Sequence, residues 1–232
     1  MGRQRNVDRI QLVEDLSRDE PEAIIRTLAM MACNPAIARV LERNGVGKFE
    51  SLIVEVMPGL SKIATQTEFD SFRAEICEKI ILTFRTNKDV GLSWGQAQKP
   101  VNVFLKVYAA WAKLPNLATA EGLQPFLHVP LDSALMSFIK EKFPQEYRWH
   151  MQEVCAKLVS DAAAQHPNLA QGRTTRWLID NVELSFMPRP VYIAWQEFLR
   201  FIHPDRPILF GHDLGEATQP RRQRLTREIL VC

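Results

Sequence analysis

The stretch that decides the fold is Gly91-Leu-Ser-Trp-Gly-Gln-Ala-Gln-Lys-Pro-Val-Asn-Val-Phe-Leu-Lys106. A glycine-bearing turn leads into a run that stays apolar on most sides to Trp111, which is typical of a helix that other helices surround. Proline is favoured in the first helical turn, so Pro100 predicts the start of this helix and leaves Lys99 near its N-cap. There the helix dipole disfavours an ammonium and favours the free amine that nucleophilic chemistry needs.

Apolar residues recur at helical spacing in nearly all of the remaining chain, which predicts an all-α fold. Pro35 and Pro190 stand where proline opens a helix, Asn44 fits a helix C-terminus, and Thr67 with Asp70 opens a longer helix. We find no alternating strand pattern and no internal repeat. The predicted helices cover residues 10–16, 21–32, 35–41, 49–56, 67–84, 101–111, 130–143, 147–164, 176–182 and 190–202.

Length and composition are those of an ordinary globular protein, with 232 residues, 46% hydrophobic and 24% charged. We expect one compact all-helical domain over residues 1–232, with the segment 85–140 lying in a cleft between two helical lobes. The sequence has no apolar run of about 20 residues and no apolar signal-peptide core at its start. It therefore predicts a cytoplasmic monomer that makes no membrane contact.

Cysteine and histidine spacing gives no sign of a metal site. The cysteines are far apart in the sequence, and most of them sit inside apolar helical patterns, at Cys33, Cys77, Cys155 and Cys232. This usage is typical of reduced thiols, and the histidines show no ligand spacing with cysteine or carboxylate. We therefore predict that the protein holds no metal and no other cofactor.

Charge is informative only locally, because a formal net charge of +2 neither requires nor excludes a nucleic-acid partner. Arginines gather near both ends of the chain, where they could neutralise phosphate or simply be solvated. These clusters are Arg3, Arg5 and Arg9, and Arg221, Arg222, Arg224 and Arg227.

Two glycine turns could bind a DNA phosphate through backbone N–H groups between two helices. One is Asn44-Gly-Val-Gly-Lys48 and the other is Gly91-Leu-Ser-Trp-Gly95. The DNA-binding candidates are therefore Gly45, Gly47, Lys48, Gly91 and Gly95. The same pattern also occurs in tight helix connections with no ligand, and neither turn has the strand or the spacing of a P-loop. A different pairing, with Lys48 as nucleophile and Asp70 as its partner, remains open.

One part of the chain resembles a known family. Lys99-Pro-Val-Asn-Val-Phe-Leu-Lys106, followed by Val129-Pro-Leu-Asp132, is similar to the lysine helix and the Pro-x-Asp turn of the helix-hairpin-helix DNA glycosylase superfamily. The resemblance is to its archaeal 8-oxoguanine branch, and related all-helical glycosylases act in bacterial defence against phages with modified bases. It covers roughly residues 85–140, and this sequence lacks the Gly-x-Gly that commonly precedes the lysine.

The resemblance implies that Lys99 and Asp132 are catalytic. A carboxylate can stabilise the positive charge that builds on deoxyribose as the glycosidic bond breaks, and a lysine amine can attack C1′ to form an imine. Alternatively, Asp132 orients water. Taken singly, an aspartate after proline is an ordinary helix cap, and a lysine at a helix end is solvated.

A flipped base would need a pocket, for which the candidates are Trp94, Gln96 and Gln98. The tryptophan can stack on a base or belong to the core, and the glutamines can read a base edge or satisfy loop backbone. We expect a DNA glycosylase that excises a modified base from duplex DNA, either a bulky phage base or oxidised guanine, with lyase activity left open. The alternative is a non-catalytic helical DNA-binding or adaptor protein.

Overall fold

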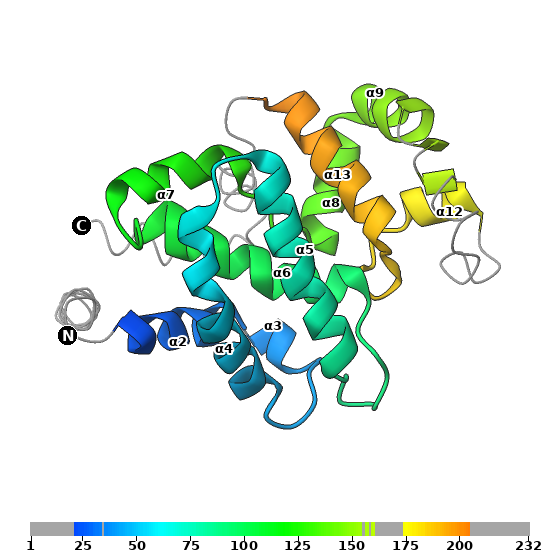
Figure 1. Ribbon diagram of the computed structural model, residues 1–232. Helices are drawn as coiled ribbons and strands as arrows, with labels where there is room; N and C mark the ends of the chain where they lie inside the picture. The colour runs from blue at the N-terminus through cyan, green and yellow to red at the C-terminus, as the bar shows by residue number, and fades with distance from the viewer. Residues whose placement is uncertain (1–20, 34, 155, 158, 161–173, 205–232) are drawn as a thin grey trace, which may run out of the picture. The chain divides into compact units, whose positions relative to one another are not determined.

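The protein is all-α throughout the part of the chain that the structure, a computed structural model, describes (Figure 1). That part comprises residues 21–33, 35–154, 156–157, 159–160 and 174–204. Within it the only extended pairing consists of two isolated bridges, Leu41 with Thr86 and Arg85 with Gly91. The all-α prediction is confirmed for these residues. The predicted helix 10–16, both arginine clusters, Cys155 and Cys232 lie outside them.

The chain folds as two compact units, which we call unit 1 and unit 2. Unit 1 comprises the described residues up to Leu92 together with Val103–Phe126. Unit 2 comprises Ser93–Asn102 together with the described residues from Leu127 onward. The segment 85–140 is therefore divided between the two units.

Unit 1 is built around helices α2 and α4, which pack side by side (Figure 1). Its core includes Phe49, Ile53, Phe69 and Ile80, all of them buried. In chain order its elements are α2 (Pro21–Ala32), α3 (Pro35–Ala38), α4 (Gly45–Val56), η1 (Met57–Lys62), α5 (Gln66–Thr83), the end of α6 (Trp94–Leu105), the π-helical turn η2 (Lys106–Trp111), α7 (Leu117–Leu123) and η3 (Gln124–Phe126).

Helix α5 begins one residue earlier than Thr67, which the sequence had suggested as its opening residue. The N-cap is Thr65, whose hydroxyl accepts from the Glu68 N–H while the Glu68 carboxylate accepts from the Thr65 N–H. This reciprocal capping box satisfies two backbone donors that the first turn would otherwise leave unpaired. Thr65-x-x-Glu68 is its sequence signature.

Unit 2 is organised on its last described helix, α13, whose apolar face is buried as its amphipathic pattern predicted. Its core contains Trp195, Tyr192, Phe198, Met136 and Ile139. The elements are the start of α6 (Trp94–Leu105), α8 (Ser133–Lys142), α9 (Pro144–Tyr147), the π-helical segment η4 (Arg148–Val154), α12 (Thr175–Asp180), η5 (Leu184–Phe186) and α13 (Arg189–Ile202).

The prediction that Pro100 starts the central helix was wrong, because α6 begins at Trp94 and contains Pro100 in its interior. Ser93 and Gln96 form the true start. The Ser93 hydroxyl accepts from the Gln96 N–H at 3.1 Å, and the Gln96 side-chain oxygen accepts from the Ser93 N–H at 3.0 Å. Ser-x-x-Gln is a capping box, and it outweighs the preference of proline for the first turn.

Gly95 allows the first turn of α6 to lie directly against the η5 segment. Its N–H donates to the Met187 carbonyl at 3.0 Å, and a Cβ at this position would lie 2.5 Å from the Leu184 carbonyl oxygen. The Ser93 hydroxyl donates to the same Leu184 oxygen. The glycine is therefore required by close packing of two backbones.

No helix in the described ranges combines the length and the apolar character that crossing a bilayer requires.

Replacing Gly95 with alanine should destabilise unit 2. The added methyl group would overlap backbone at Leu184, and overpacking of this kind costs about 1–3 kcal/mol. The matched control is Gly122→Ala in α7, where a Cβ would meet no atom within 4 Å. The control should be neutral or stabilise by up to about 1 kcal/mol. Urea unfolding followed by circular dichroism measures both, and an unchanged midpoint for Gly95→Ala would contradict the packing described above.

Candidate active site

The structure brings Lys99 and Asp132 together within unit 2, although they are 33 positions apart in the sequence. Lys99 Nζ donates to Asp132 Oδ2 at 3.2 Å. The lysine side chain is 17% exposed and the aspartate side chain 41% exposed, so the pair is accessible from solvent mainly through the carboxylate. The two side chains that the resemblance pairs are therefore in contact.

Asp132 divides its two carboxylate oxygens between two tasks. It is the N-cap of α8, where Oδ1 accepts from the Leu135 N–H at 2.8 Å, and Oδ2 receives the Lys99 ammonium. Capping by one oxygen fixes the plane of the carboxylate and aims the other oxygen at the lysine. The cap reading and the pairing reading of this residue therefore hold at the same time.

Lys99 does not occupy the helix terminus at which the dipole would favour a free amine. It is the sixth residue of α6, beyond the first turn to which the dipole effect is confined. The charged group that it contacts is the Asp132 carboxylate. A lysine attacks only as the free amine, so any chemistry that uses Lys99 as a nucleophile must include a step that removes its ammonium proton.

Behind the pair lies a chain of buried polar side chains, which we call the Tyr192 network: Gln98, Asn102, Tyr192 and His128. Asn102 Nδ2 donates to Gln98 Oε1 at 2.6 Å and to the Tyr192 hydroxyl at 2.9 Å. The Tyr192 hydroxyl also shares a hydrogen bond with His128 Nδ1, and the two rings stack. Each of these side chains is at most 2% exposed. Helix α13 is therefore joined to α6 and to the segment that leads to Asp132.

A second contact from α13 holds the same segment. Gln196 accepts from the Val129 N–H at 3.0 Å and donates to the Val129 carbonyl at 2.9 Å, in the way a neighbouring strand would. Tyr192 and Gln196 are four residues apart and so share a face of α13. We had assigned no function to Tyr192, Asn102 or Gln196. The available signal was that these polar groups stand on otherwise apolar helix faces.

The residues predicted to line a base pocket are engaged with the protein itself. Trp94 is buried, with its ring tilted against Tyr192 and the Arg189 guanidinium 5.0 Å from the ring centre. Gln96 belongs to the capping box of α6, and Gln98 donates to the Gly95 carbonyl at 3.0 Å. Both glutamines thus satisfy local backbone, which is one of the two roles left open for them.

The five DNA-binding candidates do not form two similar loops. Gly91 lies in the bridge with Arg85, whereas Gly95 lies inside α6 with its N–H bonded to Met187. Gly45 and Gly47 are in the first turn of α4, after Asn44 in the left-handed conformation (φ 65°). The helix before them, α3, already ends at Ala38, so the Asn44–Lys48 stretch opens a helix without directly joining two.

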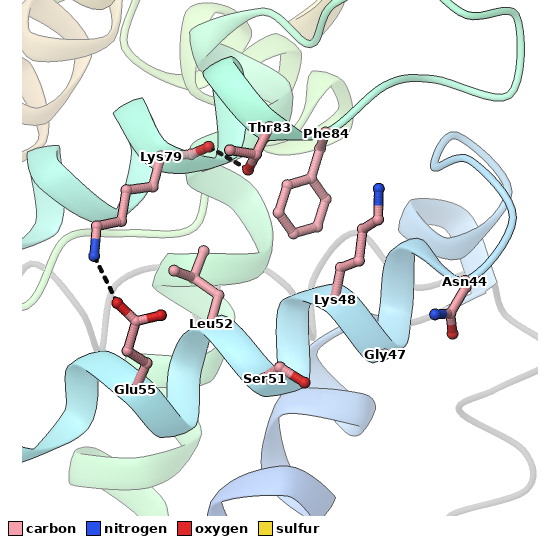
Figure 2. A pocket seen from close by; sticks show the side chains of 9 residues that line it. All are labelled: Asn44, Gly47, Lys48, Ser51, Leu52, Glu55, Lys79, Thr83 and Phe84. Atoms are coloured by element: carbon pink, nitrogen blue, oxygen red, sulfur yellow. Dashed lines mark hydrogen bonds and ion pairs between the residues drawn. The ribbon is translucent and has the colours of Figure 1, made fainter.

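A hollow of about 600 Å³ lies beside the start of α4, entirely within unit 1 (Figure 2). Figure 2 shows Leu52 and Phe84 between the Lys48 side chain and the ion pair of Lys79 with Glu55. Lys48 itself pairs with Glu42 at 3.0 Å. The lining residues are Asn44, Gly47, Lys48, Ser51, Leu52, Glu55, Lys79, Thr83 and Phe84.

The alternative pairing of Lys48 with Asp70 gains no support from these contacts. Lys48 donates to the Glu42 carboxylate, and this bond is the largest cause of the lowered pKa of Glu42. Asp70 instead accepts from the Gln66 side chain at 3.0 Å, one turn away on α5. Asp70 is the fifth residue of α5, and the acidic residue of the first turn is Glu68, so the prediction that Asp70 belongs to the first turn was wrong.

Among the described residues no three histidine, cysteine, aspartate or glutamate side chains are grouped as metal ligands. Cys33 and Cys77 are free thiols in the interior. Burial, and after it the charge of Glu50, raises the pKa of the Cys33 thiol to about 12. Because the thiolate is the reactive form, Cys33 is not suited to act as a nucleophile.

No protein-family model matches the chain, and comparison with curated proteins and with solved structures gives no significant match.

Substitutions at Asp132 should separate its two tasks. Asparagine caps a helix about as well as aspartate, so Asp132→Asn should leave the unfolding free energy nearly unchanged. Asp132→Ala removes the cap of α8 and should lower that free energy by about 0.5–2 kcal/mol. Urea denaturation of the two variants provides the comparison. Equal destabilisation would mean that the ion pair with Lys99, and not the cap, dominates at this position.

Proposed function

We propose that this protein is a DNA glycosylase that flips a modified base out of duplex DNA and excises it. The observation that carries the proposal is the contact of 3.2 Å between Lys99 Nζ and Asp132 Oδ2, on a part-buried lysine. An amine and a carboxylate at this distance are the two groups that cleavage of an N-glycosidic bond can use. They also occupy the two segments that carry the family resemblance.

The proposed reaction assigns one role to each group. As the bond from C1′ to the base breaks, positive charge develops on the sugar, and the Asp132 carboxylate stabilises it. Lys99, once it has lost a proton, attacks C1′ through its free amine. Opening of the sugar ring then gives an imine, with the ring oxygen taking a proton, and this intermediate permits a later lyase step. If Lys99 does not attack, Asp132 instead activates a water molecule.

A glycosylase-like helix-hairpin-helix fold is part of the same proposal. What supports it is the order of elements: a helix bearing Lys99, a connection through η2 and α7, and then a Pro-x-Asp turn in which Asp132 caps the next helix. The proposed partner is duplex DNA. The modified base is either a bulky base of phage DNA or an oxidised guanine, and the shape of the base pocket decides between them.

Non-catalytic DNA binding is the second candidate function, and the hollow beside α4 is the observation that favours it. Gly47, Lys48 and Lys79 lie along its wall, where a phosphate could meet an ammonium and the start of a helix. Both lysines already pair with carboxylates, Lys48 with Glu42 and Lys79 with Glu55. A phosphate would have to displace these partners, so we rank this function second.

Base release should depend on Lys99 and Asp132 but not on other lysine–aspartate pairs. We expect Lys99→Met and Asp132→Asn to lower base release by at least about 100-fold while DNA binding survives, as loss of one key electrostatic group typically does. The matched control is Lys140→Met, because Lys140 also belongs to unit 2 and pairs with Asp180 at 3.8 Å.

The assay uses duplexes that contain 8-oxoguanine and phage DNA with glucosylated bases, and it detects free base and alkali-labile sites. Borohydride should trap native protein, but not Lys99→Met, on DNA if the imine forms. Release of base without trapping would assign the chemistry to water activated by Asp132. If the native protein releases no base and both variants bind DNA as it does, the glycosylase proposal is wrong and DNA binding alone remains.

A further inference from the structure

We propose that the Tyr192 hydroxyl is the positioning group that holds Lys99 and Asp132 in contact. The inference deepens the proposed function in its consequence for catalysis, whereas its structural part can be tested without any substrate. Tyr192 is linked to the pair through other side chains. It acts on one neighbour of each, Asn102 on α6 and His128 in the segment before α8.

The first connection runs from Tyr192 to the helix that carries the lysine. Asn102 Nδ2 donates to the Tyr192 hydroxyl at 2.9 Å, and Asn102 follows Lys99 by three residues on α6. Residues at this spacing are neighbours on one helix face, with Cβ atoms about 5–6 Å apart. The other amide hydrogen of Asn102 goes to Gln98, the residue directly before Lys99. The rotation of α6 at Lys99 is therefore fixed against α13.

The second connection runs from Tyr192 to the segment that carries the aspartate. His128 Nδ1 is hydrogen-bonded to the same hydroxyl, its ring stacks on the Tyr192 ring at 5.6 Å, and Asp132 follows four residues later. Gln196 secures the next residue, Val129, by both its N–H and its carbonyl. The hydroxyl of Tyr192 is thus the point at which the lysine helix and the aspartate segment meet.

The buried network, and not the ion pair, has the strength to set this geometry. A part-exposed lysine–carboxylate pair contributes little to stability, because its two charged groups give up hydration for one contact and a long lysine side chain must be ordered. The Tyr192 hydroxyl, Asn102 Nδ2 and His128 Nδ1, in contrast, belong to buried side chains, and each of these groups would carry a desolvation cost if it lost its partner. The positions of α6 and of the 127–132 segment follow from that requirement, and the ion pair forms as a result.

Tyr192→Phe tests the inference, because it keeps the ring in the core and removes only the shared hydroxyl. The matched control is Tyr147→Phe. Tyr147 is likewise a buried tyrosine of unit 2, and its hydroxyl bonds to the Ile179 carbonyl and to Asp180, away from the Tyr192 network. Both variants lose a buried hydroxyl, but only the first loses the link between α6 and the aspartate segment.

The direct readout is the side-chain ammonium signal of Lys99 in ¹⁵N-lysine-labelled protein, recorded cold and at mildly acidic pH. Its hydrogens should exchange slowly in native protein, and the Lys99→Arg spectrum assigns it. Asp132→Asn should speed the exchange, Tyr192→Phe should speed it several-fold, and Tyr147→Phe should leave it unchanged. The inference would be overturned if the Lys99 ammonium hydrogens exchanged as slowly in Tyr192→Phe as in the native protein. It would also be overturned if Tyr147→Phe accelerated the exchange as much as Tyr192→Phe does.

One further variant and one further measurement keep the test decisive. If Tyr192→Phe does not fold, Asn102→Leu cuts only the connection to α6 and should give the same faster exchange at Lys99. In a base-release assay Tyr192→Phe should lower kcat by about 10–100-fold with little change in KM, because displacement of a catalytic group by about 1 Å has effects of this size. If native protein releases no base, the proposed function fails, while the exchange measurement still decides the role of Tyr192.

Discussion

Unit 2 depends on one constraint, which is that burying a polar group is costly unless the group is hydrogen-bonded inside the protein. The Tyr192 side chain is fully buried, and its hydroxyl meets this constraint by pairing with Asn102 and His128. Because the three groups come from α13, α6 and the segment before α8, pairing them also places these elements. Apolar packing alone would tolerate small rotations of a helix, whereas a buried hydrogen bond does not.

The part-exposed Asp132 carboxylate connects these buried contacts with the protein surface. The Leu135 backbone N–H holds Oδ1 at the start of α8. The other oxygen, Oδ2, accepts a hydrogen bond from Lys99 of α6. A carboxylate with a fixed plane is a better electrostatic partner for developing positive charge than a mobile one, since no reorganisation is needed during reaction. Capping of α8 is therefore compatible with the proposed catalytic role of Asp132 and would support it.

Sequence reasoning succeeded where a pattern is local or repeated and failed where a side chain chooses among partners. Helical periodicity predicted α13 and the all-α class. The contact between Lys99 and Asp132, 33 positions apart, has no local signal and was expected only from the family resemblance. The start of α6 was misplaced because Pro100 was weighed without the Ser93–Gln96 capping box, and both signals were present in the sequence. The link between Asn102 and Tyr192, 90 positions apart, has no local signal, because only the tertiary fold selects that partner.

The proton on Lys99 connects this geometry to the proposed chemistry. A lysine ammonium is no nucleophile, yet a departing base needs a proton as its bond to C1′ breaks. Transfer of the Lys99 proton to the base would meet both needs: it neutralises the leaving group and leaves a free amine. The Asp132 carboxylate would then lose its cationic partner as the sugar becomes positive, so its charge is available when the transition state requires it. An ion pair at rest is therefore compatible with nucleophilic attack, provided that the base accepts the proton.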